Sequence, residues 1–225
     1  MTPPLALPDW VGPVAHYLVH TGLPETVKLA ALAVVGAAIV GIVLGTLLTI
    51  RWLPLQALIR LYIEVWRGLP IVVTIFFVYF SLPTIDIRFN AFKAAALALI
   101  LWGSAQVAEA TRGAVQSIPR EQHEAAAALG FGWVGRHAFV ILPQALRRLL
   151  PPLVGLLVNV IQNTTVAFVI GVAEILQAGQ RQVERLTLET GDPHAFEIFG
   201  AVMIAFFLIS FPLTRLAAYL ERRLV

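Results

Sequence analysis

Charged side chains interrupt an apolar stretch of this chain at helical spacing. Arg60, Glu64 and Arg67 recur at intervals of four and three residues, so one helical face carries all three and Glu64 can pair with either arginine. Ionised groups at membrane depth are costly, so they mark a solute path or an ion pair that locks helices together, and both can hold here. Gly68 and Pro70 follow directly. Because Pro70 has no N–H, we expect a helix break, the kind of place where transporters bind solutes.

A second polar set, without charge, lies in a later apolar stretch. Asn159, Gln162 and Asn163 share one helical face, and Thr164 and Thr165 follow them. Such a stripe faces a pore or forms hydrogen bonds to a neighbouring helix, and both alternatives stay open. The candidates for a substrate path are therefore Glu64, Arg67, Gly68, Asn159, Gln162, Asn163, Thr164 and Thr165.

Other chemistries find little support in the sequence. Glu109 and Arg112, three residues apart near the end of a further apolar stretch, suit a structural or gating role, as does Pro70. The chain has no cysteine, and its five histidines lack the spacing of metal ligands, so we expect no metal site. Ser81 and Ser104 have no histidine neighbour within an apolar stretch, which disfavours an intramembrane hydrolase.

Composition indicates an integral membrane protein. Of the 225 residues, 59% are hydrophobic and 13% are charged, about half the charged share of a soluble domain. The mean hydropathy is +0.83. Apolar stretches long enough to cross a bilayer lie at 26–50, 58–82, 91–113, 149–172 and 196–220. We therefore predict an all-α membrane protein with about five transmembrane helices. In the first stretch Gly36, Gly41 and Gly45 are spaced for close helix packing.

The charge distribution gives an orientation. With the N-terminus outside, ten basic and four acidic residues lie on the cytoplasmic side, and five basic and eight acidic residues lie on the outer side. The positive-inside rule therefore predicts N-out and C-in. Residues 1–25 become an outer segment, 26–225 a transmembrane domain, and 173–195 an outer loop. The basic residues call for anionic lipid at most, so we expect no nucleic-acid partner.

The longest polar segment, 113–148, lies on the predicted cytoplasmic side. We expect a short helix over 121–129, with Gly130 as its left-handed C-terminal cap. A second short helix follows from Trp133 to Leu142, and Pro143 separates it from the next span, whose first turn holds Pro151 and Pro152. Exposed alanines and nearby apolar side chains in this segment would suit a partner protein.

These residues resemble a known motif. The loop of ABC-importer permeases reads Glu-Ala-Ala, then Gly, then Ile-x-Leu-Pro, and this chain matches it with Val140 in place of the usual Ile. The matching residues are Glu124, Ala125, Ala126, Gly130, Leu142 and Pro143. Further similarity to permeases of the polar amino acid uptake family covers most of 22–176. It includes Gly22 and Thr26, the run Tyr62–Pro70, Ala108-Glu109, Arg112-Gly113 and 116–119.

The resemblance implies a type I ABC importer transmembrane domain that works by alternating access in the bacterial cytoplasmic membrane. It implies four partners: a cytosolic ATPase dimer docked on the coupling loop 117–143, a second permease subunit, identical or homologous, a periplasmic or lipid-anchored amino acid binding protein, and the lipid bilayer. This chain would bind no cofactor, because ATP and Mg²⁺ belong to the ATPase. An ATP-independent secondary transporter or channel is the alternative.

The chain departs from the family pattern at one place. The family often has Lys-Asp-Thr-Ser where this chain has Gln162-Asn163-Thr164-Thr165. Neutral amides thus replace an ammonium and a carboxylate. If this position touches the solute, it does so without a charge, which implies a different amino acid or a subunit that binds no solute itself.

Overall fold

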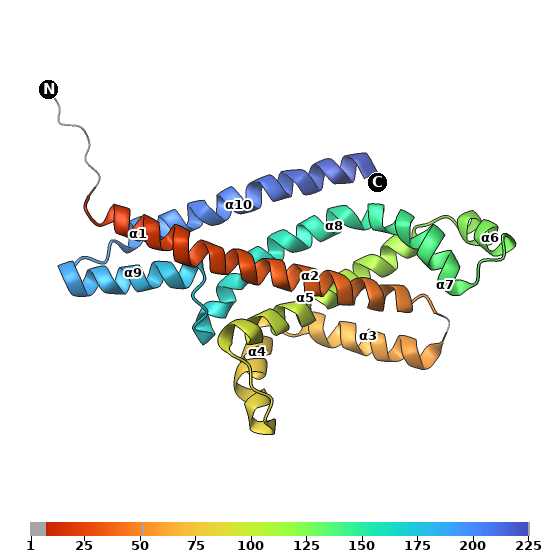
Figure 1. Ribbon diagram of the computed structural model, residues 1–225, viewed down its shortest axis with the longest axis horizontal. Helices are drawn as coiled ribbons and strands as arrows, with labels where there is room; N and C mark the ends of the chain where they lie inside the picture. The colour runs from red at the N-terminus through yellow and green to blue at the C-terminus, as the bar shows by residue number, and fades with distance from the viewer. Residues whose placement is uncertain (1–7, 51, 225) are drawn as a thin grey trace.

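The computed structural model describes residues 8–50 and 52–224 as an elongated bundle of helices (Figure 1). Residues 1–7 of the expected outer segment lie outside the described residues. Three long helical runs and α10 cross the bundle. They are α1 Val11–Tyr17 with η1 Leu18–Gly22 and α2 Leu23–Leu47, then α5 Ala91–Gln116, then α7 Trp133–Arg136 with η4 His137–Ile141, α8 Leu142–Asn163 and η5 Thr164–Ile170, and finally α10 Ala195–Leu224.

These four runs contain 37, 26, 38 and 30 residues, and each is long and apolar enough to cross a membrane. The fifth candidate span is a bent pair. It joins α3, Leu53–Gly68, to α4 Ile71–Phe76, η2 Phe77–Ser81 and η3 Leu82–Ile85, with a bend of 105°. The helix break predicted at Pro70 is confirmed, and the apolar stretch 58–82 is bent sharply at that break. Leu69 and Pro70 adopt extended backbone angles, which ends the helix outright.

The helical run that contains the first span begins at Val11, because a π-helical turn at 18–22 joins α1 to α2 without a break. Two further expectations need correction. The expected outer loop 173–195 holds the helix α9, Ile175–Thr190. Pro143 separates no helices, and Pro151 and Pro152 lie inside α8. The π-helical turn at 137–141 shifts the hydrogen-bond register directly before Pro143, which has no N–H to donate.

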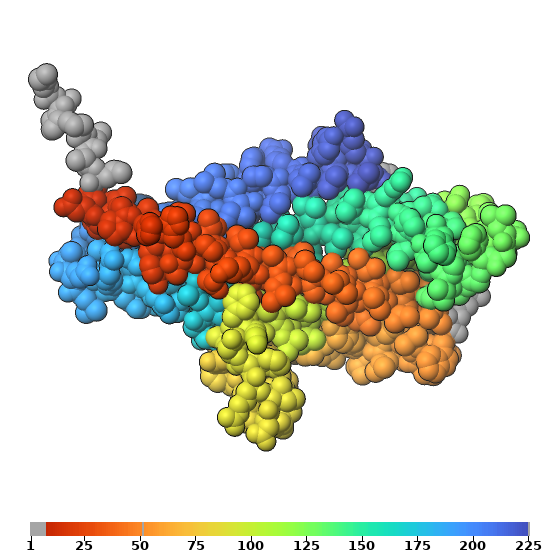
Figure 2. Space-filling model, viewed as in Figure 1, coloured from red at the N-terminus to blue at the C-terminus, as the bar shows by residue number. Residues whose placement is uncertain are grey.

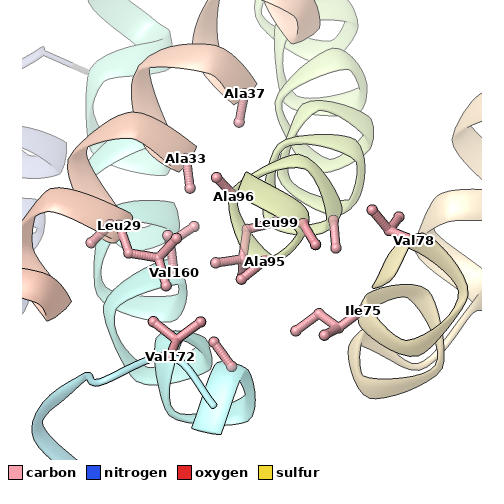
Figure 3. Packing of buried hydrophobic residues seen from close by; sticks show 14 of the residues in the cluster. Leu29, Ala33, Ala37, Ile75, Val78, Ala95, Ala96, Leu99, Val160 and Val172 are labelled. Atoms are coloured by element: carbon pink, nitrogen blue, oxygen red, sulfur yellow. The ribbon is translucent and has the colours of Figure 1, made fainter. Parts of the chain in front are cut away.

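Small residues bring α2 and α5 into close contact at the centre of the bundle. Figure 3 shows Ala33 and Ala37 of α2 facing α5, with Ala96 and Leu99 opposite. A Cβ placed on Gly41 would lie 2.4 Å from the Cβ of Val107, and one placed on Gly45 would lie 2.4 Å from the carbonyl oxygen of Ala108. Close packing of the glycine face, predicted from spacing, is thus confirmed.

Different helices form the two ends of the molecule. The short helices α6, Arg120–Ala128, and α7 lie at one end in Figure 1, and α1 and α9 lie at the opposite end. Between them the α4 segment projects sideways from the bundle, as the yellow arm in Figure 2. Phe76, Phe77 and Phe80 on this arm are exposed.

Candidate functional site

The helix α6 is held on the bundle through one alanine. Ala126 is 2% exposed, whereas Glu124 and Ala125 beside it are exposed. Pro119 precedes the helix with extended backbone angles, and Arg120 donates to Glu124 at 2.7 Å. Gln144 of α8 donates to Gln122 at 3.2 Å and ties the helix to the long span. The outward face of α6 is therefore free of contacts within the described part of the chain.

Gly130 ends α6 as the sequence predicts. Its φ is +81°, in the left-handed region. The N–H of Gly130 donates to Ala127 at 3.0 Å, and the N–H of Phe131 donates to Ala126 at 3.1 Å. This pair of bonds is the Schellman arrangement, which satisfies the last carbonyls of the helix. Leu129, 78% exposed, and Val134, 72% exposed, flank the turn.

The motif residues therefore divide into two groups. Glu124, Ala125 and Gly130 lie on the surface around the turn. Ala126 anchors α6, and Leu142 and Pro143 lie where η4 passes into α8, with Leu142 half-buried and Pro143 exposed. An exposed helix with apolar flanks and a rigid C-terminal turn is suited to docking a partner. Because the turn is already ordered, little conformational entropy is lost on binding.

Charged residues of α3 and α5 meet at a small cavity. Arg60 and Glu64 line it from α3, and Glu109 and Arg112 line it from α5, around a volume of about 210 Å³. The Arg112 guanidinium donates to both carboxylate oxygens of Glu109. Arg112 also donates to Gln116 at 2.7 Å. The sequence placed the two pairs on separate helices, and their convergence is a finding of the fold.

The expected ion pair of Glu64 with Arg60 or Arg67 is not formed. Among the described residues no basic group lies within 4.0 Å of the Glu64 carboxylate. All three side chains are exposed, and Arg60 and Glu64 line the cavity beside α5 without touching each other as an ion pair. Arg67 and Gly68 lie at the end of α3, just before the break at Pro70.

The polar stripe of α8 does not act as one surface. Asn159 lines a cavity of about 340 Å³ between α5 and α8, together with Gln106 and Trp102. Gln162 is exposed, and the Asn163 amide nitrogen donates to the carbonyl of Asn159 at 2.8 Å. The hydroxyls of Thr164 and Thr165 each donate to a carbonyl three residues back, at 2.7 Å. One member of the predicted set, Asn159, therefore reaches a cavity.

Sequence reasoning missed Gln106 on the other wall of that cavity. The signal was present, because Gln106 is a polar side chain in the middle of an apolar stretch. Its partner across the cavity lies 53 positions later in the chain, so spacing rules could not join the two. Together they line the cavity with neutral amides, beside the Trp102 ring.

Sequence reasoning also missed Glu174, which is fully buried at the N-terminus of α9. Its carboxylate accepts from the N–H of Leu176 at 3.0 Å and of Gln177 at 2.8 Å. Burial raises the pKa of Glu174 to about 7 from its ordinary 4.5, against the lowering effect of those two bonds. Thr26 of α2 accepts from the N–H of Ile175 at 3.0 Å, so α9 is fixed to the first span.

No group of three or more His, Asp or Glu side chains among the described residues could hold a metal ion. The geometry contains an exposed face on α6, a charged cavity between α3 and α5, and an amide-lined cavity between α5 and α8.

The sequence is similar to those of known proteins. Residues 37–225 match the family model described as binding-protein-dependent transport system inner membrane component. The glutamine transport system permease protein GlnP of Escherichia coli K12 is 36% identical over 220 residues, covering 96% of this chain and 97% of that protein. The glutamate/aspartate import permease protein GltJ of the same organism is 30% identical over 91% of this chain and 86% of that protein.

Solved structures agree. A crystal structure of an amino acid ABC transporter with histidines gives a TM-score of 0.80 at 28% identity, covering 97% of this chain and all of that one. An inward-facing MetNI methionine ABC transporter gives a TM-score of 0.77 at 16% identity, which supports the fold alone.

The fold and these matches define an ABC importer permease, a transport component without an ATPase site of its own. The chain belongs to the family of inner membrane components of binding-protein-dependent transport systems. The expectation of an ABC importer permease of the polar amino acid family is confirmed, and an ATP-independent transporter is not favoured.

Proposed function

We propose that this chain forms part of a pore that imports polar amino acids across the bacterial cytoplasmic membrane. The observation that carries the substrate class is the cavity lined by Gln106 and Asn159. Its walls offer neutral donors and acceptors and no ionised group, which suits an uncharged polar side chain. GlnP and GltJ, named for the transport of glutamine and of glutamate and aspartate, support the same class.

In this proposal a cytosolic ATPase dimer docks on the coupling loop 117–143 and carries the ATP and Mg²⁺. The outward face of α6 and the capped turn at Gly130 support this role. When the ATPase dimer closes, α6 moves with it, and the continuous 38-residue run that begins at Trp133 transmits the movement to the cavity as a rigid body.

The charged cavity supports a gating role for Glu109 and Arg112. The pair lies on α5, and Arg60 and Glu64 face it from α3. A shift of α3 relative to α5 would change which carboxylate each arginine pairs with. The shift requires little repacking, because the cavity is not filled by side chains. Pro70 supplies the break about which the arm at 71–85 can turn independently of α3.

The remaining partners follow from surfaces that this chain leaves open. The projecting arm with Phe76, Phe77 and Phe80 supports a second permease subunit, since so much exposed aromatic area calls for a protein or lipid neighbour. The end with α9 supports contact with a substrate-binding protein, on the proposed N-out orientation. Residues 1–25 would then be an outer segment and 26–225 the transmembrane domain.

The decisive experiment measures ATP hydrolysis in proteoliposomes that contain this chain and its ATPase. Binding protein and a panel of amino acids are added singly. We expect one loaded binding protein to stimulate hydrolysis, which identifies the solute. A requirement for a different second permease would show a heterodimeric pore. Solute flux without nucleotide would overturn the proposal in favour of a secondary transporter.

A further inference from the structure

A cavity of about 790 Å³ lies between α6, the start of the long span at α7, and the end of α2. Arg120 and His123 line it from α6, Trp133 and Arg136 from α7, and Thr49 from the α2 end. No transport role proposed above uses this cavity. It is the largest of the cavities described here, and it lies where the spans meet the polar end of the molecule.

The cavity contains hydrogen-bond donors that lack acceptors. The Arg136 guanidinium has no acid within 4.0 Å and no hydrogen-bond acceptor among the described residues, and its Nε is buried. The buried indole Nε1 of Trp133 has no partner either. Buried donors without acceptors are costly, and native proteins satisfy them by side chain, water or ligand. Both donors therefore call for an acceptor.

The other polar groups at the cavity are already engaged or neutral. Glu124 accepts from Arg120 at 2.7 Å, so this rim carries no free acid. His137 is held at both ring nitrogens, by Thr49 Oγ1 at 3.1 Å and by the Trp133 carbonyl at 2.9 Å. Burial, with His137 and Arg136 nearby, lowers the pKa of His123 and favours its neutral form. The net charge of the lining at neutral pH is thus positive, through Arg136.

The surroundings place the cavity at a membrane boundary. Thr49 follows the first span directly, and Trp133 begins another. On the same run Phe139 is 74% exposed, and Trp52 is exposed beside the α2 end. Tryptophan side chains such as Trp52 and Trp133 are typical of the level of lipid headgroups.

We propose that this cavity binds the phosphate group of an anionic phospholipid, with Arg136 as the principal ligand. Arginine suits phosphate because its planar donors match the phosphate oxygens, and basic pockets between membrane helices commonly take anionic headgroups. The Trp133 N–H supplies a neutral donor to the same group. A bound lipid would brace α6 against the span ends, because the cavity has α6 on one side and the spans on the other.

The test measures lipid retention on the purified full-length chain by native mass spectrometry. Phosphatidylglycerol and phosphatidylcholine are titrated onto the wild type, Arg136→Gln and Arg147→Gln. Arg147 is exposed on α8 and lines no part of the cavity. Arg147→Gln therefore removes the same charge as Arg136→Gln but leaves the cavity unchanged. We expect Arg136→Gln to weaken phosphatidylglycerol binding about tenfold. Arg147→Gln and the wild type should bind it equally, and both should prefer it over phosphatidylcholine.

Trp133→Phe keeps an aromatic side chain, though a smaller one, and removes the N–H, so it provides a mild second variant if Arg136→Gln does not fold. It should weaken binding about threefold. Displacement by millimolar inorganic phosphate would show that a free phosphate also occupies the site, and no displacement would show that the lipid is required. Equal retention of phosphatidylglycerol by all variants would overturn the proposal. Because binding is read on the chain alone, the outcome does not depend on the transported solute.

Discussion

Gly130 forms the left-handed turn that ends α6, beside the surface proposed to dock the ATPase. Its φ of +81° is unfavourable for any side chain with a Cβ, and Leu129 beside it is 78% exposed. Replacing it by aspartate costs about 1 kcal/mol in backbone strain and adds a charge to an apolar contact. We expect Gly130→Asp to insert normally and to lower ATP-driven uptake more than tenfold, about 1.4 kcal/mol or more of coupling.

Gly130→Asn is the matched control for this prediction. Asparagine tolerates the left-handed region as well as aspartate does and carries no charge. It should retain more uptake than Gly130→Asp, with both measured in vesicles that hold equal amounts of the protein. Wild-type uptake by an inserted Gly130→Asp protein would show that the turn does not contact the ATPase.

Asn159 and Asn163 are the two amides whose roles the structure separates. Asn159 lines the cavity opposite Gln106, whereas Asn163 donates to the backbone of its own helix. A carboxylate at 159 would attract cationic solutes, so Asn159→Asp should shift preference from neutral polar toward basic amino acids about tenfold.

Asn163→Asp tests the alternative that residue 163 lines the solute path. It removes the donor to Asn159 and should lower the yield of folded protein more than it changes selectivity. Competition between radiolabelled amino acids in proteoliposomes measures both variants. If Asn159→Asp leaves selectivity and rate unchanged, the amide cavity does not contact the solute.

Glu174 makes stability depend on pH. Its pKa in the folded protein, about 7, lies above the ordinary 4.5, so as pH rises through this window the unfolded chain loses its proton first. Ionisation therefore favours unfolding, and stability falls from pH 4.5 to 7 by about 3 kcal/mol at most. Glu174→Gln should remove this part of the fall, measured as denaturation midpoints in detergent at pH 5 and 8.

Glu189→Gln is the matched control, since Glu189 lies on the same helix but is exposed. It should keep the pH dependence of the wild type. If Glu174→Gln loses stability with pH as steeply as the wild type does, Glu174 is ionised across the range and acts only as a helix cap.

The helices α2 and α5 pack closely because their backbones come into contact at glycine positions. A Cβ on Gly45 would lie 2.4 Å from the Ala108 carbonyl oxygen and 2.6 Å from the Thr111 Cβ. Backbone atoms cannot move aside without separating the helices. Gly45→Ala should therefore destabilise the protein by about 1–3 kcal/mol, read from thermal unfolding in detergent.

Gly113→Ala, in α5, serves as the control because nothing lies within 4 Å of its Cβ position. It should leave stability equal or slightly higher, since alanine favours helix over glycine. Equal midpoints for both variants would mean that α2 and α5 do not approach as closely in the membrane.

The orientation of the whole molecule can be tested with cysteines, because the chain has none. Leu188 on α9 is 88% exposed, and Leu129 beside α6 is exposed at the opposite end. On the predicted topology, a membrane-impermeant maleimide should label Leu188→Cys in intact cells and Leu129→Cys only after lysis. The reverse pattern would place α6 outside and exclude docking of a cytosolic ATPase.

Properties that depend on neighbouring residues were predictable from the chain. Apolar length predicted the spans, Pro70 predicted the helix break, and Gly130 predicted the left-handed cap, because each follows from backbone chemistry within a few positions. The motif around Glu124 also predicted an exposed helix. Its surface depends on local sequence because α6 contacts the bundle through little more than Ala126.

Properties that depend on distant residues required the fold. Gln106 meets Asn159, Glu109 meets Glu64, and Glu174 is buried, only because α5, α8, α3 and α9 pack as they do. Pro143 stays within a helix because the π-helical turn before it shifts the hydrogen-bond register at the position where proline has no N–H to donate. Helix periodicity assigns a residue to a face, but which helix covers that face depends on packing between segments far apart in the chain, and this packing decides which polar groups share a cavity.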